Sequence, residues 1–131
     1  QVTIPLIESD LGEMLLAAAE GRIESYQPIF SNKSAVTVVL ASEGYPGPSK
    51  TGREITGEST RIEEGEITAF VHQAGTNRNE DGKLLSSGGR VLSATAVASD
   101  LSSAVDAAYA VIDEITLKGS HYRRDIAYRA L

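Results

Sequence analysis

The sequence predicts an α+β fold, in which one long helix covers one face of a mainly antiparallel sheet. Segment 101–115 repeats apolar residues at helical spacing, with polar residues between them. Segments 35–41 and 90–97 are rich in β-branched and small apolar residues, which is typical of strands. Loop 77–82 contains an Asp-Gly pair and predicts a hairpin, so neighbouring strands should run antiparallel.

A short helix is expected near the start of the chain. Ser9 or Asp10 can cap its free backbone N–H groups, and apolar residues follow at helical spacing. Gly21 favours the end of this helix. Residues 1–8 can form a preceding helical turn, and residues 22–33 are expected to be a connection with some extended chain.

Strands are expected in the middle of the chain. Segment 35–41 has apolar residues on both faces, which predicts a central strand rather than a solvent-facing one. It ends at a turn rich in Gly and Pro over 43–47. Segment 66–71 is expected to be a second long strand, and 83–85 and 90–97 are expected to be the next two.

The clearest helix follows these strands. Asp100 is positioned to cap it, and its apolar stripe runs over 101–115. The last dozen residues, 120–131, are polar and aromatic.

Composition excludes several classes of function. The 131 residues, of which 41% are hydrophobic and 23% charged, are typical of one globular domain. The net charge of −6 argues against a nucleic-acid partner. The absence of Cys and the presence of only two His residues argue against a Cys- or His-rich metal site. No apolar run is long enough for a bilayer and no signal peptide is evident, so we expect no membrane partner and a cytoplasmic location.

Gly88-Gly89-Arg90 is a candidate binding motif. Two glycines before a strand allow the backbone to approach a ligand closely, and Arg offers a planar fork for phosphate or carboxylate. The alternative is a bulged hairpin with a solvated Arg. His72 lies at a strand end, but a lone His is more often structural, so it receives no catalytic role.

The segment 122–129 carries three Arg, one Asp and two Tyr. It could be an anion-binding or interface segment in which Asp125 orients an Arg. It could instead be a tail that docks on the domain through Tyr burial and ion pairs, which we favour.

Eight segments occur in a characteristic order: residues 5–11, 41–47, 52–57, 74–76, 88–92, 95–96, 122–126 and 128–130. Together they resemble phosphoribosylamine–glycine ligases, also called glycinamide ribonucleotide synthetases. The ordered set covers nearly the whole chain and is specific, although each piece alone is not. Two positions depart from the family pattern: His72 stands one residue before the usual His, and Ala127 replaces the usual Gly. The sequence also resembles fungal versions in which the ligase is fused to an aminoimidazole ribonucleotide synthetase.

The resemblance implies an ATP-grasp enzyme of de novo purine biosynthesis that joins glycine to 5-phosphoribosylamine and yields glycinamide ribonucleotide. Residues 1–30 would end the helical ATP-grasp portion, and 31–131 would form the C-terminal ligase domain. ATP and Mg or Mn are the implied cofactors, with metal ligands expected upstream of Gln1. The implied partners are glycine, 5-phosphoribosylamine, and the upstream ATP-grasp and N-terminal domains. The 131 residues alone are expected to lack ligase activity.

In this picture the chain contributes one wall of the active-site cleft, without a catalytic side chain or metal ligand of its own. The candidate substrate-binding residues are Gly44, Gly47, Thr76, Gly88, Gly89, Arg90 and Asp125. Arg90 would meet a substrate carboxylate or phosphate. Two alternatives stay open: a non-catalytic structural or interdomain packing module of the same enzyme, or an unrelated small-molecule-binding domain.

Overall fold

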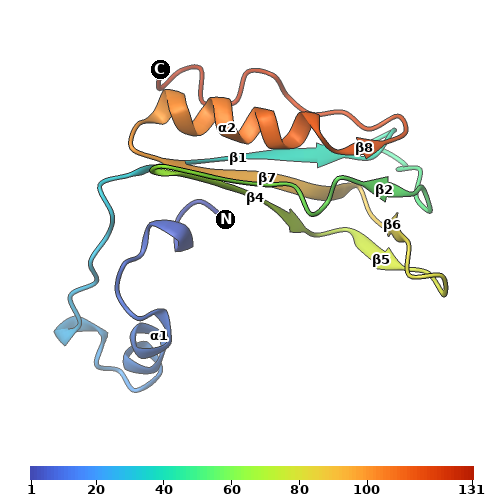
Figure 1. Cartoon of the computed structure of the whole chain (residues 1–131). Helices are drawn as coiled ribbons and strands as arrows, with labels where there is room; N and C mark the ends of the chain where they lie inside the picture. The colour runs from blue at the N-terminus through green and yellow to red at the C-terminus, as the bar shows by residue number, and fades with distance from the viewer.

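A four-stranded antiparallel sheet forms the centre of the computed structural model, which describes residues 1–131 (Figure 1). Its strands, in spatial order, are β1 (Ser34–Ala41), β7 (Arg90–Ala98), β4 (Ile67–Gln73) and β3 (Arg61–Glu64). The α+β class and the antiparallel sheet are therefore confirmed.

Smaller elements surround this sheet. Strands β2 (Ile55–Thr56) and β8 (Thr116–Leu117) pair with each other, as do β5 (Thr76–Arg78) and β6 (Leu84–Ser86). The helices are α1 (Leu11–Ala19) and α2 (Leu101–Asp113), and two 3₁₀ turns span Ile4–Leu6 and Ile23–Ser25. The hairpin predicted over 77–82 is confirmed by the β5–β6 pair.

The prediction that 35–41 is a central strand is wrong, because β1 lies at the edge of the sheet. Only one edge of β1 pairs with another strand of the sheet, β7. Thr37 and Val39 on one face of β1 line a cavity closed by the C-terminal tail, and Val39 is 37% exposed. The central strand is β7, where eight of nine residues are buried.

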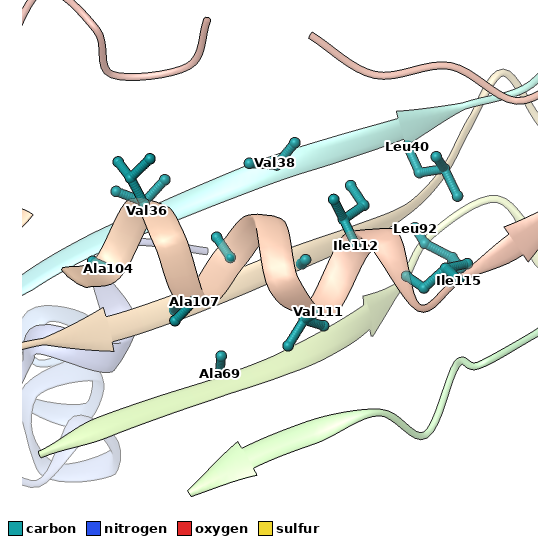
Figure 2. Close-up of a cluster of buried hydrophobic side chains, with 14 of the residues drawn as sticks. Val36, Val38, Leu40, Ala69, Leu92, Ala104, Ala107, Val111, Ile112 and Ile115 are labelled. Carbon is teal, nitrogen blue, oxygen red and sulfur yellow. The ribbon is translucent and has the colours of Figure 1, made fainter. Parts of the chain in front are cut away.

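Helix α2 packs against one face of the sheet, and small side chains form much of the contact (Figure 2). The helix begins where the Asp100 carboxylate accepts a hydrogen bond from the Ser103 backbone N–H at 2.9 Å. Ala94 and Ala96 of β7 and Ala108 of α2 are fully buried, so the helix can lie close to the sheet. The surrounding core contains larger side chains such as Leu40, Leu92, Val111 and Ile112.

The opposite face of the sheet carries buried polar side chains. Thr37 and Thr95 are hydrogen-bonded to each other at 2.8 Å. The next row places His72 opposite Ser93. His72 Nε2 and Ser93 Oγ are both buried without a hydrogen-bond partner.

The N-terminal segment lies beside this polar face and apart from α2 (Figure 1). Asp10 caps α1 by accepting from the Glu13 N–H at 3.0 Å, which confirms the predicted helix start. Large apolar side chains of this segment are exposed: Ile4, Leu15, Leu16, Ile23, Ile29 and Phe30. No helix of the chain combines the length and the hydropathy needed to cross a membrane.

Candidate functional site

Three segments meet at one end of the sheet, where β1 and β4 end and β7 begins. Ser42, which follows β1, connects β1 to the segment before β7. Its backbone N–H donates to Gly89 O at 2.8 Å, and its hydroxyl donates to Gly88 O at 2.9 Å. The Gly75 N–H donates to Arg90 O at 3.0 Å and brings in the end of β4. The backbone that carries Arg90 is therefore held from both sides.

Glycines allow this close approach. A Cβ on Gly75 would lie 2.7 Å from Arg90 O, and a Cβ on Gly89 would lie 2.6 Å from a ring carbon of Tyr45. The register shifts between Leu40 and Ala41, opposite Arg90, as a β-bulge does. The Gly-Gly pair thus serves the packing of the bulged β1–β7 pair rather than a hairpin, while the side chain of Arg90 remains exposed.

The turn after β1 is fixed by charged side chains at its base. Gly44 has φ of +95°, which favours glycine, and the Lys50 N–H donates to Glu43 O at 2.9 Å. Glu43 pairs with Arg53 at 2.7 Å. Hydrogen bonds from Lys50 and then Arg53 lower the pKa of Glu43. These contacts hold the base of the turn that carries Tyr45.

A cavity of about 280 Å³ opens between this turn, the outer part of β1 and the C-terminal tail. Its lining residues are Thr37, Val39, Ala41, Tyr45, Arg90, His121, Tyr122, Arg123 and Ile126. No Asp or Glu lines the cavity, although the protein carries a net charge of −6. Arg90 takes part in none of the ion pairs of the chain.

The tail that closes the cavity is docked on α2 and on β1. His121 exchanges two backbone hydrogen bonds of 2.9 Å with Ala41. The Tyr109 hydroxyl donates to Arg123 O at 2.8 Å and accepts from the Ile126 N–H at 3.1 Å. Tyr122 bonds Asp113, and burial together with this carboxylate raises the pKa of Tyr122. The favoured interpretation of the tail as a docked segment agrees with these contacts.

Asp125 holds Arg123 by two hydrogen bonds. Arg123 Nε donates to Asp125 Oδ1 at 2.8 Å, and Arg123 Nη2 donates to Oδ2 at 2.6 Å. The pair raises the pKa of Arg123 and lowers the pKa of Asp125. The remaining N–H groups of the Arg123 guanidinium stay free for another acceptor, since a guanidinium has five N–H donors.

Comparison with known proteins decides the family. Residues 35–129 match the family model described as phosphoribosylglycinamide synthetase, C domain. The chain belongs to this family. The match begins next to the start of β1 and ends within the tail that closes the cavity.

Relatives of this synthetase C domain are longer proteins. The trifunctional purine biosynthetic protein adenosine-3 of Gallus gallus is 46% identical over 132 aligned positions, covering 100% of this chain and 13% of the relative. The phosphoribosylamine–glycine ligase of Mycobacterium tuberculosis is 43% identical over 131 positions, covering 99% of this chain and 29% of the relative. The crystal structure of the phosphoribosylamine–glycine ligase of Thermotoga maritima matches with a TM-score of 0.68 and 31% identity, covering 95% of this chain and 29% of that one. The chain thus spans less than a third of the length of these relatives.

The candidate residues chosen from sequence fall into three groups in this C domain. Arg90 lines the cavity, and Gly44, Gly47, Gly88 and Gly89 shape the turns beside it. Asp125 reaches the cavity through Arg123. Thr76 lies in the β5–β6 hairpin, where its hydroxyl donates to Gln73 Oε1, and it does not line the cavity.

Sequence reasoning did not single out Tyr45 and His121, which line the same cavity. Tyr45 lies within the predicted Gly- and Pro-rich turn, where the glycines carry the more recognisable signal. His121 is isolated in the sequence, and only the pairing with Ala41 brings it to the cavity. The chain contains no group of three or more His, Asp or Glu side chains placed to hold a metal ion.

Proposed function

We propose that the chain is the C-terminal part of an ATP-dependent ligase that joins glycine to 5-phosphoribosylamine and yields glycinamide ribonucleotide in de novo purine biosynthesis. It supplies one wall of the substrate cleft. The observation that carries this proposal is an unpaired Arg90 in a cavity without a carboxylate, in a protein of net charge −6. The names of the two ligase relatives support the same reaction.

The proposed reaction has two displacements. A carboxylate oxygen of glycine attacks the γ-phosphorus of ATP, and ADP leaves. The amine of 5-phosphoribosylamine then attacks the carbonyl carbon of glycyl phosphate, and phosphate leaves with loss of a proton from nitrogen. Both steps depend on positioning and on neutralising charge, so a wall with a guanidinium and no nucleophile suits them.

The side chains of this chain do not fit a metal site. No step through Mg or Mn is therefore assigned to them. We place the metal ligands and the ATP contacts in the ATP-grasp and N-terminal parts of the longer enzyme.

We also propose that residues 1–30 belong to the ATP-grasp portion and residues 31–131 to the C-terminal domain. The exposed apolar side chains of the first segment support this division, because such side chains are usually covered by another part of the protein. Leu15 is 59% exposed and Ile29 62%.

A second candidate is a packing module of the same enzyme that takes no part in substrate binding. The glycine contacts favour it, because Gly75, Gly88 and Gly89 approach other parts of the chain rather than open space. The family assignment removes the remaining alternative, an unrelated small-molecule-binding domain.

Steady-state kinetics of the full-length enzyme separate these two candidates. For Arg90→Ala we expect KM for glycine or for 5-phosphoribosylamine to rise roughly ten-fold or more, with the fold intact, because a charge-assisted contact is lost. Arg61→Ala on β3 is the matched control, since it removes the same charge outside the cavity. Equal kinetic constants for the two variants would favour the packing module.

A further inference from the structure

The cavity presents two guanidinium groups from two separate segments of the domain. Arg90 comes from the start of β7, and Arg123 comes from the docked tail. Arg90 is unpaired, whereas Arg123 keeps free donors beside its bond to Asp125. Both lie in the wall of one cavity of about 280 Å³.

We propose that Arg90 and Arg123 together bind the phosphate monoester of the phosphoribosyl substrate, with Asp125 as a positioning residue for Arg123. This inference rests on the proposed function and assigns its substrate end. A phosphate monoester carries nearly two negative charges and three terminal oxygens, so it suits two guanidiniums. A glycine carboxylate carries one negative charge, and one guanidinium group is enough to pair with it.

The rest of the lining agrees with a sugar phosphate. Val39, Ala41 and Ile126 give the cavity an apolar part, and Tyr45 adds an aromatic ring. Glycine has no carbon surface to place there beyond one methylene, whereas a ribose ring has carbon faces that pack on such groups. The cavity also approaches the size range of sites for small ligands, about 300 Å³ and above.

Asp125 acts through geometry. Its two bonds to Arg123 Nε and Nη2 fix the plane of the guanidinium, so the remaining donors keep one direction. The segment itself is held by the two hydrogen bonds of the Tyr109 hydroxyl, to Arg123 O and Ile126 N. In the proposed arrangement Asp125 acts on the substrate only through Arg123.

The direct test uses the full-length ligase and ribose 5-phosphate as a stable probe, measured by titration calorimetry. Arg90→Ala and Arg123→Ala should each weaken Kd for ribose 5-phosphate roughly ten-fold or more. Inorganic phosphate should compete, and ribose without phosphate should not bind measurably. Arg61→Ala and Arg129→Ala, which remove the same charge outside the cavity, should bind like the wild type.

Lysine variants at both positions serve as controls, in case the alanine variants misfold. Arg90→Lys and Arg123→Lys keep the charge and should bind more tightly than the alanine variants but less tightly than the wild type. Circular dichroism checks that each variant is folded. An unchanged Kd in folded alanine variants overturns the proposal.

Kinetics test the role of Asp125 separately. Asp125→Asn should raise KM for 5-phosphoribosylamine several-fold, while kcat and KM for glycine stay the same. A rise in KM for glycine alone would overturn the phosphate assignment and leave the proposed ligase function standing. An enzyme that binds ribose 5-phosphate through both arginines but does not form glycinamide ribonucleotide would support the phosphate site and refute the ligase.

Discussion

Gly75 packs against Gly88 so closely that a Cβ on Gly75 would lie 3.0 Å from Gly88 Cα. It would also lie 2.7 Å from the carbonyl oxygen of Arg90. The contact joins the end of β4 to the start of β7 and so helps to position the backbone of Arg90, the first residue of β7.

Replacing Gly75 with Ala should therefore both destabilise the domain and displace Arg90. We expect a loss of about 2–3 kcal/mol in the free energy of unfolding, because backbone atoms have to move. Chemical denaturation measures this loss. Gly82→Ala is the control, since a Cβ there meets nothing within 4 Å and costs only the strain of φ +79°, about 1 kcal/mol. Equal losses in the two variants would contradict the packing role of Gly75.

Removing either of the two buried hydroxyls of β7 should have a different effect on the stability of the domain. Ser93 Oγ has no partner, so Ser93→Ala should leave stability unchanged or raise it. Thr95 Oγ1 bonds Thr37 Oγ1, so Thr95→Val should cost about 1 kcal/mol. Thermal unfolding of both variants checks the contrast. A clear loss in Ser93→Ala would mean that its hydroxyl has a partner in solution.

Removing the hydroxyl of Tyr109 should loosen the tail while leaving α2 in place. Tyr109→Phe loses the bond to Arg123 O and the bond from Ile126 N. Hydrogen exchange should become faster over residues 121–127, and ribose 5-phosphate should bind more weakly. Tyr128→Phe is the control, because that side chain is exposed and bonds only Arg129.

The cap of α2 should make stability depend on pH. Hydrogen bonds from the backbone N–H and the hydroxyl of Ser103 lower the pKa of Asp100. The pKa is lower in the folded state than in the unfolded state. The stabilisation is therefore complete above the unfolded pKa of about 3.9 and is lost as pH falls through the folded pKa.

Two variants isolate this effect. Asp100→Ala should be less stable than the wild type at pH 7 because the cap is lost. Asp100→Asn keeps a capping oxygen and should be close to the wild type at pH 7, but it should lack the contribution of this carboxylate to the acid-induced loss. Melting temperatures between pH 7 and pH 2 measure both. An identical acid profile in Asp100→Asn and the wild type would contradict the assignment.

Ala127 has φ of +65° and is the one non-glycine residue of the chain with positive φ. The resemblance described in the sequence analysis implies glycine at this position in the family. Ala127→Gly should relieve a strain of about 1 kcal/mol, partly offset by the greater freedom of glycine in the unfolded chain. A small rise in melting temperature is expected, and a fall would show that the methyl group contributes more through packing.

The elements with strong local signals could be predicted from sequence. Asp10 and Asp100 mark helix starts, and apolar periodicity defines α2. The position of β1 at the edge could not be predicted, because a pattern that is apolar on both faces does not say what covers each face. The two-residue strands β2 and β8 lack any periodicity and depend on pairing across the fold.

The candidate site was predicted only in part for the same reason. Arg90 and the glycine turns carry a local signal, since glycine and arginine have recognisable uses beside a strand. His121 is brought to the cavity by a pairing with Ala41 that spans eighty residues of sequence, and no local pattern encodes it. The sequence of segment 122–129 is compatible with either a docked tail or an anion-binding segment. In the structure the tail docks on α2, and Arg123 still has N–H donors that are free to bind an anion.

The pairing of Ala41 with His121 has a further consequence for the solution behaviour of the domain. Apart from this pairing, the outer side of β1 bonds to no neighbouring backbone, and the tail shields it. A protein cut before residue 120 would bare an eight-residue strand rich in valine, which is a template for strand addition by other molecules. We therefore expect the last twelve residues to lower the tendency of the domain to aggregate, independently of any ligand.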